Sequence, residues 1–168
     1  MYFLVDLWKN ISVKPCMLGP HYDQHIENML RQEVEGQCTG KYGYVLSVVR
    51  VLHADKGRVQ DGTGMVVVHV KYQAIVLKPF RGEVVDAVVT HVNSIGIFAN
   101  CGPFRIFVTK TLIPEDFTFQ DGIWTDGEAT VKPNSEVRLK LQGVKYEGSS
   151  MVAVGTINED YLGPPEQD

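Results

Sequence analysis

At mid-sequence the chain reads Lys71-Tyr72-Gln73-Ala74-Ile75-Val76-Leu77-Lys78-Pro79-Phe80-Arg81-Gly82-Glu83-Val84-Val85-Asp86-Ala87-Val88-Val89. Two long apolar runs lie on either side of a short break at residues 78–82. Valine, isoleucine and aromatic residues favour strands, whereas Pro and Gly interrupt them. The segment therefore predicts the last strand of one domain, followed directly by the first strand of the next.

The sequence before this segment predicts an α+β domain, which we place at residues 1–80. Apolar side chains recur at steps of three and four from about residue 21 to residue 34, with Pro20 before them and Gly36 after them, as in an amphipathic helix. Strands are expected at residues 2–8, 44–52 and 65–77, and a glycine-bounded turn at residues 40–43. One helix against a small sheet is the α+β class.

The sequence after the segment predicts an all-β domain, which we place at residues 81–168. Its expected strands are 83–93, 97–99, 104–108, 136–146 and 151–157. Alternation along the first of them places His91 on the same face as Ala87 and Val89. Residues 117–135 are rich in Asp, Gly and Pro and are expected to form a loop. Five strands with a long connection before the fourth are typical of an OB-fold barrel.

The composition and the motifs of the chain limit the classes of function that can be expected. The 168 residues are 44% hydrophobic, enough for a packed core, and the formal net charge is −4. A dedicated nucleic-acid binder usually carries a basic surface, so any nucleic-acid contact is expected to be local and modest. No catalytic motif is found, and the three cysteines lack metal-ligand spacing. We therefore expect no enzymatic activity, cofactor or metal, and no membrane span, because no apolar run approaches about 20 residues.

The mid-sequence segment also resembles, nearly residue for residue, the hinge of a known family. This family comprises the seventh subunits of eukaryotic RNA polymerase II and their counterparts in the archaeal RNA polymerase. Further matches follow in order along the chain and cover nearly all of it: residues 33–45 resemble the glycine-rich tip, Gly102-Pro103, residues 106–108 and residues 112–114 resemble the barrel, and residues 154–157 and 160–163 resemble the ending.

The resemblance implies both a fold and a role. The fold is an N-terminal tip domain, of a truncated ribonucleoprotein-like type, followed by an OB-fold barrel of the ribosomal-protein S-one type. The role is that of a non-catalytic stalk subunit in the nucleus, paired as a heterodimer with the fourth subunit of RNA polymerase II. In this family the tip domain docks on the polymerase core near the clamp, the subunit supports transcription initiation, and the barrel contacts nascent single-stranded RNA.

Two sets of candidate site residues follow. Aromatic rings on an OB-fold face can stack single-stranded bases, and basic side chains can contact phosphates. The RNA-binding candidates are Phe98, His91, Arg105, Phe107 and Lys110. The docking candidates, in the glycine-rich turn, are Gly40, Lys41, Tyr42, Gly43 and Tyr44.

The expected RNA binding is weak and non-specific. The family's RNA platform corresponds by resemblance to Ile95, Phe98 and Thr109, and only Phe98 keeps an aromatic ring. The negative net charge also argues against strong binding.

Two other functions are compatible with the sequence. The first is a free-standing RNA-binding protein built on the OB barrel, such as a translation factor or an RNA chaperone. It predicts appreciable, salt-sensitive RNA affinity without a partner, which the acidic composition disfavours. The second is a stalk subunit of another nuclear RNA polymerase, since related subunits share the fold.

Overall fold

The computed structural model describes residues 1–165 and separates into two compact units. One unit is Tyr2–Lys78, and the other contains Met1 and the chain from Pro79 onward. The boundary placed between residues 80 and 81 from sequence lies two residues after this division. Within residues 1–165, no helix is long and apolar enough to cross a membrane.

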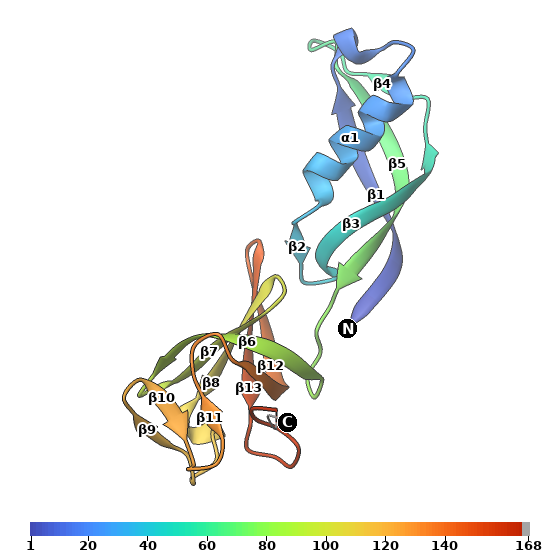
Figure 1. Ribbon diagram of the computed structural model, residues 1–168. Helices are drawn as coiled ribbons and strands as arrows, with labels where there is room; N and C mark the ends of the chain where they lie inside the picture. Colours follow the sequence, from blue (N-terminus) through green and yellow to red (C-terminus); the bar gives the residue numbers. More distant parts are fainter. Residues whose placement is uncertain (166–168) are drawn as a thin grey trace. The chain divides into compact units, whose positions relative to one another are not determined.

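The N-terminal unit is an antiparallel sheet with one helix across one of its faces (Figure 1). The strands are ordered β1-β5-β3-β2, and β4 pairs with the beginning of β5. Its elements are β1 (Tyr2–Val13), a 3-10 turn (Pro15–Met17), α1 (Tyr22–Val34), β2 (Cys38–Thr39), β3 (Gly43–Ala54), β4 (Arg58–Val59) and β5 (Val66–Leu77).

The core of this unit lies between α1 and the sheet. Ile26, Leu30 and Val34 recur at steps of four on α1, so they share one face of the helix and are buried. On β3 the buried residues Val45 and Val48 are three apart, because β-bulges each add one residue to the strand. Every second residue of β5 is buried in the same core, namely Val66, Val68, Val70, Tyr72, Ala74 and Val76. The predicted α+β domain is confirmed.

The C-terminal unit is built on a closed barrel with the strand order β12-β13-β8-β7-β6 (Figure 1). β13 pairs in parallel with β8, and the other barrel pairs are antiparallel. The predicted OB-fold barrel is therefore confirmed. Its strands are β6 (Val84–Asn93), β7 (Gly96–Cys101), β8 (Phe104–Thr109), β12 (Glu136–Glu147) and β13 (Ser150–Thr156), with a 3-10 turn (Lys110–Leu112) after β8.

The loop predicted for residues 117–135 is wrong. This region forms a small antiparallel sheet of three strands, β9 (Thr118–Gln120), β10 (Ile123–Thr125) and β11 (Thr130–Val131). Trp124 of β10 is 2% exposed, and its indole Nε1–H donates to the backbone oxygen of Asn93 at 3.1 Å. Strands of two or three residues are too short to show an alternating pattern, which explains why only the turn residues were visible in the sequence.

The face predicted for His91 is also wrong. The pairing of β6 with β7 shifts between Val89 and His91, as in a β-bulge. Since a bulge inserts one residue, the side chains beyond it point to the opposite face from the one that simple alternation predicts. Val89 is buried in the barrel and His91 is exposed.

Arg138 on β12 forms hydrogen bonds with two segments, β6 and the chain around Gly163. Its guanidinium donates to both carboxylate oxygens of Asp86 on β6, at 2.8 and 3.2 Å, and its backbone exchanges two hydrogen bonds of 2.8 Å with Gly163. The hydrogen bond from Arg138 holds the pKa of Asp86 below its ordinary value. The segment around Gly163 therefore pairs with β12 at Arg138.

Candidate nucleic-acid and docking surfaces

The barrel places four side chains in one row across its outer surface. In the strand register His91 pairs with Phe98, Phe98 with Phe107, and Phe107 with Val154. Residues directly opposite each other on paired strands share a face of the sheet. The four side chains are exposed or half-buried, whereas their neighbours Ile97, Ala99, Ile106 and Val108 are buried inside the barrel. We call this set the barrel row.

Two phenyl rings form the centre of the barrel row. The ring centroids of Phe98 and Phe107 are 4.6 Å apart, and their planes are inclined by 31°. This separation is within the range of favourable aromatic pairs. The bulge beside them is held by Thr90, whose hydroxyl donates to the backbone oxygen of Phe98 at 3.1 Å. The pair is a fixed aromatic surface of the kind that stacks nucleic-acid bases.

The two basic candidates differ in position. Arg105 lies two residues before Phe107 on β8, so it projects on the same face, and it is exposed. Lys110 begins the turn after β8, where its backbone N–H donates to Ile95 at 3.0 Å. The structure thus gathers His91, Phe98, Phe107 and Arg105 on one face and places Lys110 beyond the end of β8.

The C-terminal unit that carries the barrel row is acidic overall. From residue 79 to residue 168 the chain has seven Lys and Arg against thirteen Asp and Glu. Attraction to phosphates would therefore come from local groups such as Arg105 and Lys110, not from the field of the whole unit.

Val154 is a member of the barrel row that the sequence did not reveal. It is 40% exposed on β13. The parallel pairing of β13 with β8 joins segments about 50 residues apart, and no local pattern predicts it. Val154 lies between buried Ala153 and Gly155, and its exposure is visible only in the structure.

Within the glycine-rich turn chosen as the docking candidate, Gly43 has a structural role. Gly43 is buried with φ +85°, and an added Cβ would overlap the carbonyl oxygen of Leu77 and lie 3.0 Å from Cβ of Lys78. Lys78 Nζ donates to the Lys41 carbonyl at 2.7 Å, which ties the turn to the end of β5. Gly40 and Lys41 are exposed, while Tyr42 and Tyr44 are half-buried.

The helix-free face of the N-terminal sheet carries a further set of exposed groups. Trp8 is 52% exposed and stacks on His69, with ring centroids 4.5 Å apart and planes inclined by 11°. The Lys71 ammonium lies over the same indole at 5.8 Å and pairs with Asp6 at 3.4 Å. On β1, exposed Leu4, Asp6 and Trp8 alternate with half-buried Val5 and buried Leu7, so the three exposed side chains share this face.

Metal chemistry has no candidate site in the part of the chain that the structure describes, where no group of three or more His, Cys, Asp or Glu side chains could hold an ion. The groups gathered on the described surfaces are rings, apolar side chains and single charges, which suit binding.

An α+β domain that leads into an OB barrel with a half-buried aromatic pair on its outer surface defines a two-domain protein with an OB-fold barrel. A family model described as the SHS2 domain found in the N terminus of Rpb7p/Rpc25p/MJ0397 matches residues 8–64. A second model, the S1 RNA binding domain, matches residues 78–153.

Curated relatives align along nearly the whole chain. The chain is 40% identical over 168 residues to DNA-directed RNA polymerase II subunit RPB7 of Glycine max, covering 97% of this chain and 96% of the relative. It is 41% identical over 169 residues to the subunit of the same name of Saccharomyces cerevisiae, covering 97% and 99%. The chain belongs to the RPB7 family of RNA polymerase II subunits.

A more distant relative comes from another polymerase. DNA-directed RNA polymerase V subunit 7 of Arabidopsis thaliana is 25% identical over 167 residues, covering 95% of this chain and 92% of the relative. The SHS2 model names several related proteins together, so identity to complete relatives is what separates the polymerases.

Proposed function

We propose that this chain is a non-catalytic stalk subunit of DNA-directed RNA polymerase II, acting in the nucleus as a heterodimer with the fourth subunit. The observation that carries the proposal is identity of 40–41% to polymerase II subunits over 97% of the chain, against 25% to the polymerase V subunit. The same contrast favours polymerase II over polymerase V.

The N-terminal unit is proposed to dock on the polymerase core near the clamp and so to support transcription initiation. Within the glycine-rich turn, the exposed groups of Gly40 and Lys41 are available for contact, together with the half-buried rings of Tyr42 and Tyr44. The Lys41 ammonium lies 5.0 Å from the centroid of the Tyr42 ring, so a charge and an aromatic surface are adjacent. Gly43 shapes the turn that presents them.

The barrel is proposed to contact nascent single-stranded RNA through the barrel row. Phe98 and Phe107 would stack bases, while His91, Arg105 and Lys110 would contact phosphates. The acidic composition of this unit supports weak, sequence-tolerant binding, which suits a surface past which a transcript moves.

The proposal is tested by affinity purification of the tagged chain from nuclear extract, followed by identification of the chains that copurify. We expect the fourth subunit and the core subunits of RNA polymerase II in stoichiometric amounts. Purification with RNA alone would favour the free-standing RNA-binding protein, and recovery of the core of another polymerase would favour a stalk subunit of that enzyme.

RNA contact predicts a specific loss of affinity. Replacing Phe98 or Phe107 by alanine is expected to weaken binding of an oligouridine about tenfold, because one base–ring stack contributes roughly 1–3 kcal/mol. Fluorescence anisotropy at low salt measures the change, and Phe119→Ala, on β9, is the matched control. Equal affinity of wild type and both variants would refute a role of these rings.

A further inference from the structure

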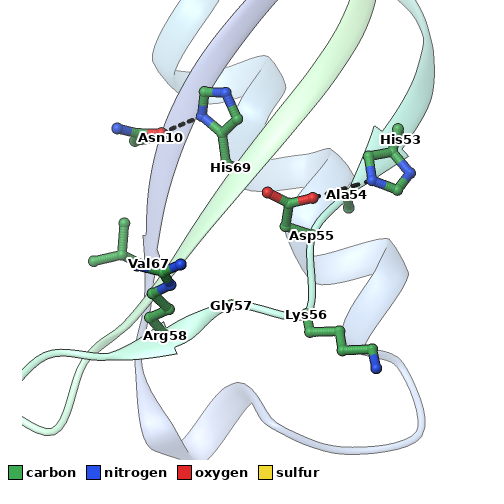
Figure 2. Close-up of a pocket in the computed structure, with 9 residues that line it drawn as sticks. All are labelled: Asn10, His53, Ala54, Asp55, Lys56, Gly57, Arg58, Val67 and His69. Atoms are coloured by element: carbon green, nitrogen blue, oxygen red, sulfur yellow. Dashed lines mark hydrogen bonds and ion pairs between the residues drawn. The ribbon is translucent and has the colours of Figure 1, made fainter.

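A groove lies on the helix-free face of the N-terminal sheet, near the end of β1 and the beginning of β5 (Figure 2). Asn10 on β1 and His69 on β5 are paired in the strand register and form one wall. The opposite wall is the end of β3 and its connection to β4. We call this site the basic groove, and it is lined by Asn10, His53, Ala54, Asp55, Lys56, Gly57, Arg58, Val67 and His69.

The basic groove has an excess of positive charge. Lys56 and Arg58 are exposed and have no ion-pair partner within residues 1–165, whereas Lys9 and Lys71 of the same unit each have one and Arg31 has two. The single carboxylate of the lining, Asp55, is engaged by Nε2 of His53 at 3.0 Å.

The walls of the groove are held in place. His69 stacks on Trp8, and its Nδ1 forms a hydrogen bond with Oδ1 of Asn10. The backbone N–H of Asp55 donates to the carbonyl of His69 at 3.0 Å, which ties the β3–β4 connection to β5.

Gly57 allows this connection to lie close against the sheet. Its φ is +79°, and an added Cβ would lie 2.7 Å from Cγ1 of Val66. A groove with little freedom to lose binds a ligand at lower entropic cost.

We propose that the basic groove binds a carboxylate-bearing segment of a partner protein. Arginine and lysine are the donors that pair with carboxylates, and the guanidinium of Arg58 can do so through two parallel hydrogen bonds. Figure 2 shows the Lys56 side chain on the β3–β4 connection and the Arg58 side chain at the start of β4, pointing away from each other. Their separation suits an extended acidic segment better than one small anion.

Single-stranded nucleic acid fits the groove less well. Stacking of bases requires accessible rings. The aromatic side chain beside the groove, Trp8, already stacks on His69 and has the Lys71 ammonium over its ring. This inference rests on the proposed docking to the polymerase core. It adds that the core would present an acidic segment to the basic groove, at the C-terminal end of β3.

The test uses the full chain and a poly-glutamate peptide as the probe, with binding measured by isothermal titration calorimetry. The variant Lys56→Gln/Arg58→Gln is compared with Arg81→Gln/Lys132→Gln, which removes the same charge from exposed positions of the C-terminal unit. We expect the groove variant to bind the peptide about tenfold more weakly, since two exposed ion pairs are lost, and the control variant to bind as wild type does.

Two outcomes of the peptide-binding experiment would overturn the inference. One is an equal loss of affinity in the two variants, which would indicate attraction by net charge alone. The other is displacement of the peptide by an oligouridine whose own binding depends on Lys56 and Arg58, which would assign the groove to nucleic acid.

Capture of core RNA polymerase II separates this inference from the proposed function. If wild type and the groove variant capture the core equally, the inference fails while the proposed function stands. If wild type captures no polymerase, the proposed docking fails, whatever the peptide result.

Discussion

Replacing Gly43 by valine is expected to destabilise the N-terminal unit by about 3 kcal/mol or more, because a β-branched residue is strained at positive φ and its Cβ has no room. At φ +85° the new side chain would overlap the carbonyl oxygen of Leu77. Leu77 is the last residue of the central strand β5, so the clash disturbs the pairing of β3 with β5 at its end.

Gly40→Val is the matched control for this result, since Gly40 lies in the same turn and an added Cβ there has no atom within 4 Å. We expect it to change stability by less than about 0.5 kcal/mol, as for most surface substitutions. Urea unfolding followed by the amide signals of the N-terminal unit measures the difference. Equal stability of the two variants would contradict the structural role of Gly43. A loss of docking in Gly43→Val alone would report unfolding, so docking is better tested at Gly40 and Lys41.

Replacing Trp124 by alanine is expected to lower the free energy of unfolding of the C-terminal unit by about 3–5 kcal/mol, the usual range for a buried Trp or Phe. The indole is 2% exposed, contacts Phe119 with ring centroids 5.6 Å apart, and donates to the backbone of Asn93 at the end of β6. Its loss leaves a cavity and an unpaired carbonyl between the small sheet and the barrel.

Phe119→Ala is the comparison, because this ring packs on the same indole but is 37% exposed. It is expected to cost about 1 kcal/mol, since less apolar area is buried. Chemical denaturation followed by barrel amide signals provides the measurement. A Trp124→Ala protein as stable as Phe119→Ala would mean that the small sheet does not anchor on the barrel.

Sequence patterns predicted the long elements well and the short ones badly. The helix over residues 22–34 and the strands of the barrel follow from period and composition within one segment. β9, β10 and β11 have two or three residues each, which is too short for an alternating pattern to show.

The barrel row could be predicted in part from the sequence, and the basic groove could not. Phe98 and Phe107 could be chosen from sequence as aromatic residues of barrel strands, but their contact at 4.6 Å and their alignment with His91 and Val154 depend on register. The basic groove could not be predicted, because its walls come from residues 10, 53–58, 67 and 69, which meet only after β1, β3 and β5 pair.

The mid-sequence segment was sufficient to indicate two units, since strand formation and interruption at Lys78–Gly82 depend on neighbouring residues, and the flanking sequence indicated that one is α+β and the other all-β. The register of the strands is determined only in the folded chain. The bulge before His91 and the buried approach of Gly43 to Leu77 arise when distant strands pair, and a shift of one residue moves a side chain to the opposite face. Local chemistry therefore determined which elements form, and tertiary pairing decided which of their side chains meet at a surface.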